Sequence, residues 1–474
     1  MTGPAKRTLA FACKAMGGTA LNAPAALGTL RFAGAASDSR EVKAGRLFFA
    51  LPGERVDGFD FCAAAAQAGA AAVVVAAHRG RPTGCSAIAV IAVADPRKAM
   101  GDLAAAVRKQ YRGRVVGVTG SNGKTTTKEL IAAALSPAGQ VLRTQGNLNT
   151  DVGLPLTVLE ATGKEKFWVL EMAMRAPGEI AYLAGIAQPH VAVVTNVAGA
   201  HLGRLGSLEA VARAKGEIFG GLGPDGIAVL PVDEPRLEPE VAAIPEAHKR
   251  RFGFAGVASA RAFVRIMEFI PDGAAGSRIR LSVGCEPVVL RLPLAGEHNA
   301  RNAAAALAVS NALGVPLLPG AAALQHATLP AHRSHVFCLG GRMVLDDCYN
   351  ANPTSMTAAL RTLVGSAGRF GRAFAILGDM LELGDAAADL HRALGQEAVT
   401  IGVAGLAVVG SLGAQIAQGA MAAGVSASRA LAFDDPEAAA QAVSTWSEPG
   451  DWILVKASRG VRLERAVEAL RKKL

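Results

Sequence analysis

The chain has 474 residues, which is enough for about three domains of ordinary size. Hydrophobic residues make up 51% and aromatic residues only 5%, a balance that favours helix-on-sheet cores of small aliphatic side chains over an aromatic-rich β-sandwich. The formal charge of +10 is spread along the chain, so it does not indicate a nucleic-acid-binding stripe; a generally basic surface and one that attracts an acidic small substrate both stay open.

The cysteines and the apolar segments indicate the compartment. Six cysteines are scattered without a CxxC pair, as is typical of a reducing cytosol: Cys13, Cys62, Cys85, Cys285, Cys338 and Cys348. No apolar run approaches the roughly 18 residues of a membrane-spanning helix, and Lys14 interrupts the short apolar stretch near the N-terminus. We therefore expect a cytoplasmic protein without a membrane span or a cleavable signal peptide.

Residues 1–112 predict a small α/β domain. Segments 46–51 and 71–77 have the composition of strands, and residues 59–70 between them predict a helix. A second helix is expected to begin at the cap residue Asp95, with Pro96 in its first position, and to end in a linker near residues 111–113.

The sequence pattern predicts strands that alternate with helices, as in doubly wound sheets, in residues 113–328 and again in residues 329–474. In the central part, strands are expected at 115–118, 167–173 and 190–197, and a long helix at 298–314. In the last part, segments 342–350, 372–380, 405–410 and 451–460 contain further strands. The last pattern is Rossmann-like, although no GxGxxG motif accompanies it.

The segment VVGVTGSNGKTTTKELIAAAL at 115–135 predicts a strand, a phosphate-binding loop and a helix. The familiar loop pattern has another glycine before Gly-Lys-Thr, but Val118 occupies that position. Gly120 and Gly123 still allow the backbone to approach phosphate oxygens, and the N-terminus of the following helix favours negative charge. Because Lys124 can reach terminal phosphates and the Thr125 hydroxyl can ligate Mg²⁺, we predict that this loop binds ATP and Mg²⁺.

A series of segments in chain order resembles the Mur ligase family, whose members make amide bonds in peptidoglycan precursors. The segments are DSREVKAGRLFFALPGERVDGFDF at 38–61, TGSNGKTT at 119–126, TQGNLNTDVGLPLTVL at 144–159, EMAMRAPGEI at 171–180, VVTNVAGAHLGRLGSLEAVARAKGEIF at 193–219, GEHNARNAAAALA at 296–308, LDDCYNANPTSM at 345–356 and ILGDMLELG at 376–384. The resemblance extends over nearly the whole chain.

The resemblance implies an α/β protein of three domains. They are a small N-terminal UDP-sugar-binding domain at 1–112, a central P-loop ATPase-like domain with a parallel sheet at 113–328, and a C-terminal Rossmann-like domain at 329–474 that binds the incoming dipeptide. The segments QGNLNTDVGLPL and YNANPTSM indicate the branch that joins D-alanyl-D-alanine to UDP-N-acetylmuramoyl-tripeptide through an acyl phosphate.

Two alternatives stay open for the activity. One is a sister ligase that adds a diamino acid or glutamate, and the other is a nucleotide-binding switch without catalysis. The expected partners are the muramoyl-tripeptide and the dipeptide, with no nucleic acid, and a monomer is expected. The sequence does not decide whether the tripeptide ends in lysine or meso-diaminopimelate.

The resemblance also assigns ATP, catalytic and metal contacts. The ATP contacts are Gly120, Ser121, Asn122, Gly123, Lys124, Thr125, Thr126, Asn302, Arg333, Asp347 and Asn350. The catalytic group is Lys124, Glu171, His201 and Lys215, and Mg²⁺ is expected on Thr125, Glu171, His201 and Lys215. Glu171 ends a predicted strand, where α/β sites form, and its oxygens suit a hard cation.

Structural alternatives accompany several of these assignments. A lysine in a helical stretch, such as Lys215, is usually solvated, whereas the resemblance places it at a lysine that CO₂ can carbamylate into a carboxylate-like metal ligand. A lone histidine such as His201 is more often structural. Asn302 and Asn299 can form the polar edge of a packed helix.

Substrate contacts are assigned to Ser37, Asp38, Ser39 and Arg40 for the UDP end, to Asn147 and Asn149, and to Ser458 and Arg459, with Lys456 beside them, for peptide carboxylates. A capped turn is the alternative for the first group. His332 and His335, which flank Arg333, are given no role. The residues Phe59, Gly203-Arg204-Leu205, Pro231 and Ala457 depart from the usual family pattern, which leaves local substrate contacts open.

Overall fold

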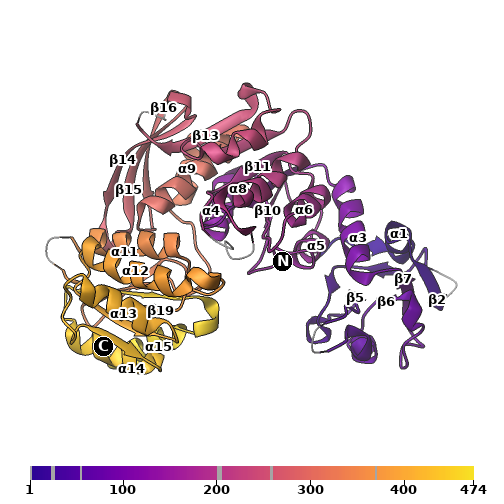
Figure 1. Cartoon of the computed structure of the whole chain (residues 1–474). Helices are drawn as coiled ribbons and strands as arrows, with labels where there is room; N and C mark the ends of the chain where they lie inside the picture. The colour runs from indigo at the N-terminus through magenta and orange to yellow at the C-terminus, as the bar shows by residue number, and fades with distance from the viewer. Residues whose placement is uncertain (1–2, 23–26, 54–55, 200–204, 257–259, 369–370) are drawn as a thin grey trace. The chain divides into compact units, whose positions relative to one another are not determined.

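The computed structural model describes residues 3–22, 27–53, 56–199, 205–256, 260–368 and 371–474 (Figure 1). The chain forms two compact units, each assembled from separate segments. The first contains residues 1–118, 138–192 and 217–226, and the second contains residues 119–137, 193–216 and 227–474. Strands and helices alternate in both, so the predicted α/β class is confirmed. Among the described residues, no helix has the length and apolar character needed to cross a membrane.

The N-terminal part of the first unit contains a five-stranded sheet with the order β2-β7-β6-β5-β4. Its strands are β2 (Thr19–Asn22), β4 (Ala35–Ala36), β5 (Leu47–Phe49), β6 (Ala72–Ala76) and β7 (Ala89–Val93). All neighbours are parallel except β2 and β7. A short antiparallel pair, β1 (Arg7–Thr8) and β3 (Arg31–Phe32), lies outside this sheet.

Three helices accompany the five-stranded sheet: α1 (Leu9–Ala15), α2 (Cys62–Gln67) and α3 (Pro96–Gln110). Helix α3 begins as predicted, because the Asp95 side chain accepts hydrogen bonds from the backbone N–H groups of Arg97 and Lys98. The helix predicted at 59–70 is instead divided between a 3₁₀ turn, Gly58–Phe61, and α2. The Asp57 side chain caps that turn, so the helical segment starts earlier but in a tighter conformation.

A nine-stranded sheet has the order β16-β15-β14-β13-β12-β11-β8-β10-β9. The strands are β8 (Arg114–Thr119), β9 (Val141–Arg143), β10 (Phe167–Glu171), β11 (Val191–Val194), β12 (Ile227–Pro231), β13 (Lys249–Phe254), β14 (Val264–Pro271), β15 (Ser277–Val283) and β16 (Glu286–Leu292). The prediction of a parallel sheet is incomplete, since β14, β15 and β16 pair antiparallel. Buried and exposed positions alternate along β15, as expected for a strand with one covered face.

The helices of this region are α4 (Lys124–Leu135), α5 (Gly153–Leu159), α6 (Glu179–Ala187), α8 (Leu208–Gly216), α9 (Glu297–Ala312) and α10 (Leu317–Leu324). Helix α9 contacts α4, α10 and the strands β12 to β15 of its own unit. Its alanine-rich segment 303–309 is buried, because small side chains allow neighbouring elements to approach closely. Helix α9 thus holds the start of α4, where the phosphate loop ends.

The C-terminal part of the second unit contains a six-stranded sheet with the order β17-β18-β22-β19-β20-β21. The strands are β17 (His335–Leu339), β18 (Arg342–Asp346), β19 (Ala373–Gly378), β20 (Gly405–Val409), β21 (Ala430–Phe433) and β22 (Trp452–Lys456), and only β17 is antiparallel to its neighbour.

Helices cover both faces of this sheet. Helices α11 (Pro353–Ala367), α12 (Ala387–Ile401) and α13 (Gly413–Ala422) share one core with side chains such as Leu454. Helices α14 (Pro436–Trp446) and α15 (Glu464–Lys473) share the other with Ile453 and Val455. Successive side chains of β22 point to opposite faces of the sheet and so pack into opposite cores, as in a doubly wound sheet.

Candidate functional site

The phosphate loop connects β8 to α4 in the conformation that its glycines allow. Gly120 has φ 144° and Gly123 has φ 75°, both positive. A Cβ atom on Gly120 would lie 1.9 Å from the Thr195 hydroxyl, and one on Gly123 would lie 2.7 Å from Asn302 Oδ1. These positions therefore require glycine both for backbone conformation and for space. Val118 remains inside β8, which explains why the loop needs no glycine there.

Residues that follow β11 hold the loop. The backbone N–H groups of Ser121 and Asn122 donate to the carbonyl and side-chain oxygens of Asn196, at 3.1 and 2.9 Å. The Asn122 carbonyl accepts from the Thr195 hydroxyl at 2.6 Å and from the Asn196 amide at 3.0 Å. The Ser121 hydroxyl donates to the Ala198 carbonyl and accepts from the Ala198 backbone N–H. The loop conformation is therefore fixed by hydrogen bonds within the protein.

Lys124 and the start of α4 complete the loop. The Lys124 Nζ atom donates to the carbonyls of Gly120 and Ser121 at 2.8 and 3.1 Å, so its charge lies against the loop. Thr125 is buried. Asn302 of α9 lies under Gly123, where its Oδ1 accepts from the Thr127 hydroxyl at 3.1 Å.

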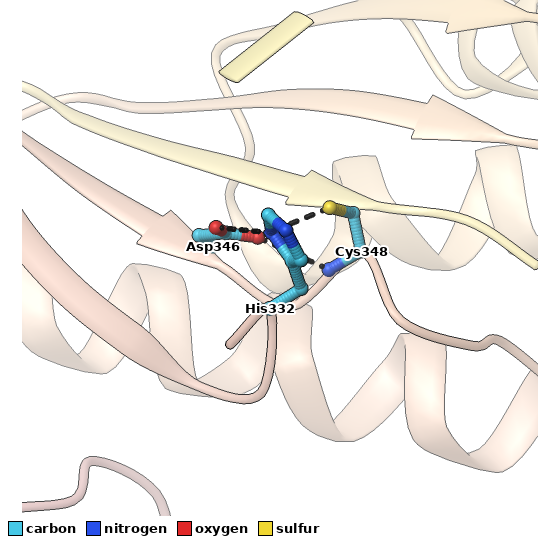
Figure 2. A group of neighbouring side chains, drawn as sticks. All are labelled: His332, Asp346 and Cys348. Carbon is cyan, nitrogen blue, oxygen red and sulfur yellow. Dashed lines mark hydrogen bonds and ion pairs between the residues drawn. The ribbon is translucent and has the colours of Figure 1, made fainter. Parts of the chain in front are cut away.

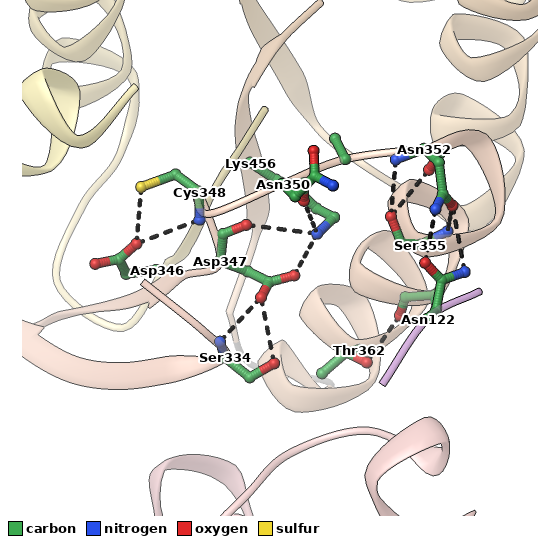
Figure 3. A network of polar contacts seen from close by, with 12 residues as sticks. Asn122, Ser334, Asp346, Asp347, Cys348, Asn350, Asn352, Ser355, Thr362 and Lys456 are labelled. Atoms are coloured by element: carbon green, nitrogen blue, oxygen red, sulfur yellow. Dashed lines mark hydrogen bonds and ion pairs between the residues drawn. The ribbon is translucent and has the colours of Figure 1, made fainter. Parts of the chain in front are cut away.

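Asn122 also reaches the cap of α11 (Figure 3). Its amide donates to Asn352 Oδ1 at 3.3 Å, and the Asn352 amide donates to Asn122 Oδ1 at 2.6 Å. Asn352 forms a capping box with Ser355 at the start of α11. One reciprocal amide pair thus connects the phosphate loop to a helix that covers the six-stranded sheet.

Asp347 follows β18 and is held by Ser334 and Lys456 (Figure 3). Its Oδ1 accepts from the Ser334 backbone N–H at 3.0 Å, and its other oxygen forms an ion pair with Lys456. Lys456, at the end of β22, also donates to the Asn350 carbonyl at 3.0 Å. The predicted nucleotide residues Asp347 and Asn350 are therefore brought together by Lys456, which the sequence pointed to as a contact for peptide carboxylates.

Two guanidinium groups lie over the Tyr349 ring. The Arg333 Cζ atom is 3.9 Å from the ring centroid, and the Arg459 Cζ atom is 5.6 Å from it. These distances suit cation–π contacts. Arg333 and Arg459 were predicted for different ligands, and the structure places them around one aromatic ring.

Ser458 is buried and bonded to the backbone. Its hydroxyl accepts from the Leu381 N–H at 2.9 Å and donates to the Ala351 carbonyl at 3.2 Å. These contacts hold the loop after β19 next to the loop after β18. The predicted substrate contact of Ser458 stays a prediction, since both of these bonds are structural.

His298, at the start of α9, is close enough to Asp347 and Lys456 to respond to their charges. Burial lowers its pKa, the Asp347 carboxylate opposes this effect, and the Lys456 ammonium reinforces it. A neutral imidazole is therefore expected at pH 7.

In the first unit, Glu171 lies at the end of β10 in register with Val118. Its carboxylate is buried and accepts from the Asn149 amide at 2.8 Å, while its backbone N–H donates to the Thr144 hydroxyl at 2.9 Å. The structure thus brings Glu171 and Asn149 together, whereas the Asn147 side chain is exposed.

Lys215 is 1% exposed and lies in α8, so the interpretation as an ordinary solvated lysine is wrong. His201 lies outside the described residues, as does the departure Gly203-Arg204.

The predicted UDP group lies on a short turn in the first unit. Asp38 caps the 3₁₀ turn Ser39–Glu41 by accepting from the Arg40 backbone N–H, and it also pairs with the Arg40 guanidinium. These hydrogen bonds lower the pKa of Asp38 to about 2. The capped-turn alternative therefore describes the local structure, and a ligand role stays a prediction for these residues and for Ser37.

Three residues with clear positions in the site were not predicted: Thr195, Asn196 and Asn352. Lys456 was predicted, with Ser458 and Arg459, as a contact for peptide carboxylates, and the structure pairs it with Asp347. Asn196 follows a predicted strand at the edge where α/β sites form, and Asn352 precedes Pro353, as N-caps commonly do. These signals were available in the sequence. The sequence did not show which residues these side chains contact, because the contacts join segments that are distant in the chain.

Family comparisons match the chain in three successive parts. Residues 31–108 match the Mur ligase family, catalytic domain; residues 118–310 match the Mur ligase middle domain; and residues 332–459 match the Mur ligase, glutamate ligase domain. With the fold and the phosphate loop described above, these matches show that the chain belongs to the Mur ligase family.

Particular relatives are similar over almost their full length. The UDP-N-acetylmuramoyl-tripeptide–D-alanyl-D-alanine ligase of Bacillus subtilis is 37% identical over 438 residues, which covers 92% of this chain and 93% of the relative. The crystal structure of MurF from Acinetobacter baumannii has a TM-score of 0.87, 32% identity and 99% coverage of both chains. The structure of MurF ligase from Thermotoga maritima in complex with ADP has a TM-score of 0.80 and 31% identity, covering 93% of this chain and 97% of that one.

Proposed function

We propose that this chain is an ATP-dependent amide ligase that joins D-alanyl-D-alanine to UDP-N-acetylmuramoyl-tripeptide. The products are UDP-N-acetylmuramoyl-pentapeptide, ADP and phosphate, so the reaction serves peptidoglycan precursor synthesis. The observation that carries the proposal is the similarity, over more than nine-tenths of both chains, to a ligase of this name. The ADP complex of the Thermotoga relative supports the nucleotide, and the phosphate loop supplies a place for it.

The reaction has two steps. A carboxylate is a poor electrophile, so its oxygen first attacks the γ-phosphorus of ATP, which releases ADP and leaves an acyl phosphate. The dipeptide amine then attacks the acyl carbon, the C–O bond to phosphate breaks, and the amine loses a proton. Both steps move charged phosphoryl groups, so positioning and charge neutralisation provide most of the catalysis.

The phosphate loop positions the nucleotide in this mechanism. Its backbone N–H groups and the N-terminus of α4 attract phosphate oxygens. The Lys124 ammonium lies against the Gly120 and Ser121 carbonyls and exchanges these contacts for terminal phosphate oxygens. We assign the phosphates to the loop residues Gly120, Ser121, Asn122, Gly123, Lys124, Thr125 and Thr126 and to Arg333. We assign Asp347 and Asn350 to the ribose and nucleoside end, and Asn302 of α9 to a further nucleotide contact.

Mg²⁺ is proposed on Thr125, Glu171, His201 and Lys215. The fit rests on donor chemistry: the buried Glu171 carboxylate and the Thr125 hydroxyl offer the oxygen atoms that a hard cation prefers. The Asn149 amide orients the Glu171 carboxylate. When bound, Mg²⁺ neutralises phosphate charge.

Burial of Lys215 supports its proposed carbamylation. An amine this little exposed is not a solvated surface lysine, and its neutral form is the one that reacts with CO₂. Mass spectrometry of the protein in bicarbonate tests for the adduct. An unmodified Lys215 combined with full activity of Lys215→Ala would contradict this part of the proposal.

We further propose a cytoplasmic monomer with three domains. Residues 1–112 bind the UDP end through Ser37–Arg40, residues 113–328 activate the carboxylate, and residues 329–474 bring the dipeptide to Ser458 and Arg459. The pairing of Arg40 with Asp38 supports a role for Arg40 in holding this turn.

The test is phosphate release by the purified chain with ATP, Mg²⁺ and D-alanyl-D-alanine, with either the lysine or the meso-diaminopimelate tripeptide. Release is expected with one or both tripeptides and is expected to be abolished in Lys124→Ala. Turnover on a free diamino acid or glutamate, with none on the dipeptide, would instead indicate a sister ligase. No turnover with any acceptor, but intact ATP binding, would indicate a nucleotide-binding switch.

A further inference from the structure

Three potential metal ligands meet at the end of β18 (Figure 2). They are His332, Asp346 and Cys348, and their ligand atoms lie within 4.8 Å of one another. The His332 Nδ1 atom is 2.8 Å from Asp346 Oδ2, and the Cys348 thiol donates to Asp346 Oδ1 at 3.1 Å. The mechanism proposed above uses none of these side chains.

The backbone brings the three side chains together from two segments. Asp346 is the last residue of β18, and Cys348 follows two positions later. His332 lies in the turn before β17, where its φ is +63°. The Tyr349 backbone N–H donates to the His332 carbonyl at 3.1 Å, which closes this turn onto the segment after β18. The cluster therefore depends on tertiary structure and is not a chance feature of one loop.

The cluster is buried on one side and open on the other. The side chain of Asp346 is 4% exposed and Cys348 is 1% exposed, whereas the side chain of His332 is 31% exposed. A small ion can therefore approach along the imidazole, while the sulfur and carboxylate are shielded from water. Apolar residues surround Cys348, including Ile453 and Val455 of the core that it shares with α14 and α15.

We propose that His332, Asp346 and Cys348 form a site for a thiophilic divalent cation, best matched by Zn²⁺. One sulfur, one nitrogen and one oxygen are common zinc ligands, and a water molecule would complete the tetrahedron. Zinc ligands at about 2.0–2.3 Å from the ion lie roughly 3.3–3.7 Å apart. The observed N–O and S–O separations of 2.8 and 3.1 Å are slightly shorter, and all three ligand atoms lie within 4.8 Å of one another, so the Asp346 carboxylate must move away from both neighbours to admit the ion.

Charge balance supports this choice of ion. A thiolate and a carboxylate together neutralise one divalent cation, which avoids leaving net charge in a mostly buried site. On binding, the Cys348 sulfur forms a bond to the metal and its proton passes to solvent, while neutral His332 contributes a nitrogen lone pair. Mg²⁺ is a poor match because it prefers oxygen ligands, so this site is chemically distinct from the proposed Mg²⁺ site.

A metal ion in this cluster would lie next to residues proposed to bind the nucleotide. His332 directly precedes Arg333, and Asp346 directly precedes Asp347. A metal bound here would fix the turn and the strand end from which these two residues extend. If the proposed nucleotide role of Arg333 and Asp347 holds, occupancy of this site would change the KM for ATP. That consequence rests on the proposed function, but metal binding itself does not.

The experiment uses Co²⁺ as a spectroscopic probe, followed by competition with Zn²⁺, on the full chain freed of metal with a chelator and kept reduced. The variants are Cys348→Ser and His332→Gln. The matched controls are Cys338→Ser and His335→Gln, because both residues are exposed and lie on β17 close in sequence to the site. No nucleotide or peptide substrate is present, so failure of the ligase proposal cannot alter the result.

We expect one equivalent of Co²⁺ to give a thiolate-to-cobalt absorption band that Zn²⁺ removes. The band should disappear in Cys348→Ser, and His332→Gln should weaken binding by roughly tenfold or more. Both controls should bind as the native chain does. Because His332 is partly exposed, His332→Gln is expected to fold, which circular dichroism checks. The proposal is overturned if the native chain gives no thiolate band, if His332→Gln binds unchanged, or if a control loses binding as a site variant does.

Discussion

Single residues decide whether the phosphate loop can form, and Gly120 is the most constrained of them. We predict that Gly120→Ala lowers kcat/KM for ATP by about 100-fold, because a displacement of about 1 Å in a positioning element has effects of this size. The new methyl group would meet the Thr195 hydroxyl at 1.9 Å, at a φ that disfavours alanine. Steady-state kinetics and calorimetry with ADP provide the measurement.

Gly185→Ala is the matched control for this substitution. Gly185 lies inside α6, and a Cβ atom there would have no neighbour within 4 Å. Alanine is also the better helix former, so unchanged kinetics and equal or higher thermal stability are expected. Normal ADP affinity in Gly120→Ala would show that the loop does not need this glycine.

The cysteines differ in environment, and a second residue-scale prediction concerns their reactivity. Cys285 and Cys338 are exposed, whereas Cys62 is buried. Burial raises the pKa of Cys62 to about 12, so its reactive thiolate is scarce at neutral pH. We expect iodoacetamide to label Cys285 and Cys338 early and Cys62 only after unfolding, as followed by peptide mass spectrometry. Early labelling of Cys62 in the folded chain would contradict this assignment.

Among the secondary-structure elements, the amide pair between the phosphate loop and α11 couples two distant segments. We predict that Asn122→Ala and Asn352→Ser each weaken ADP binding about fivefold, an energy of about 1 kcal/mol that is typical of hydrogen-bonded neighbours. Serine at position 352 can still cap α11, so helix stability is preserved. The double variant should bind ADP no more weakly than either single variant. Additive effects, measured by calorimetry, would show that the two amides act independently.

A second prediction about secondary-structure elements concerns the ion pair between Asp451 and Arg372, the residues that directly precede β22 and β19. Burial opposes ionisation of Asp451, but hydrogen bonds from the Arg372 guanidinium and from the backbone N–H groups of Glu448 and Arg372 outweigh it and lower the pKa of Asp451. A lowered pKa in the folded state stabilises the fold above the unfolded-state pKa of about 3.9, and this stabilisation is lost as pH falls through the folded-state value.

We therefore expect Asp451→Asn to cost about 2 kcal/mol at neutral pH, the usual contribution of hydrogen bonds to a charged group. The difference from the native chain should shrink as pH falls below about 4. Thermal unfolding of both proteins between neutral pH and pH values below 4 measures this difference in stability. Asp389→Asn, which alters a carboxylate that is 85% exposed on α12, should have little effect at any pH. A constant difference at all pH values would rule out ionisation of Asp451 as the cause.

The same elements show what the sequence could predict. Helix α3 and the strands β8 and β22 were predictable because their signals are local: an Asp-Pro cap and short apolar runs. The antiparallel strands β14 to β16 were missed, although β15 alternates between buried and exposed positions, because strand pairing depends on distant partners. For the same reason, the pairing of Asn122 with Asn352, 230 positions apart, could not be read from either segment.

At the level of the whole molecule, the residues proposed for one reaction are divided between the two compact units. Ser37–Arg40, Asn149 and Glu171 belong to the first unit, and Lys124 and Asp347 belong to the second. Both units are built from interleaved segments, so no single cut in the chain separates them. If the proposed site residues are correct, ligand binding energy would couple the two units.

This division predicts compaction of the chain when its ligands bind together. In small-angle X-ray scattering, we expect the radius of gyration to fall with a non-hydrolysable ATP analogue, UDP-N-acetylmuramoyl-tripeptide and D-alanyl-D-alanine present together, because the residues proposed for these ligands belong to both units. The dipeptide alone should cause no change, and Lys124→Ala should compact less because its nucleotide affinity is reduced. Calorimetry establishes that all three ligands are bound. An unchanged radius at saturation would contradict the predicted domain closure.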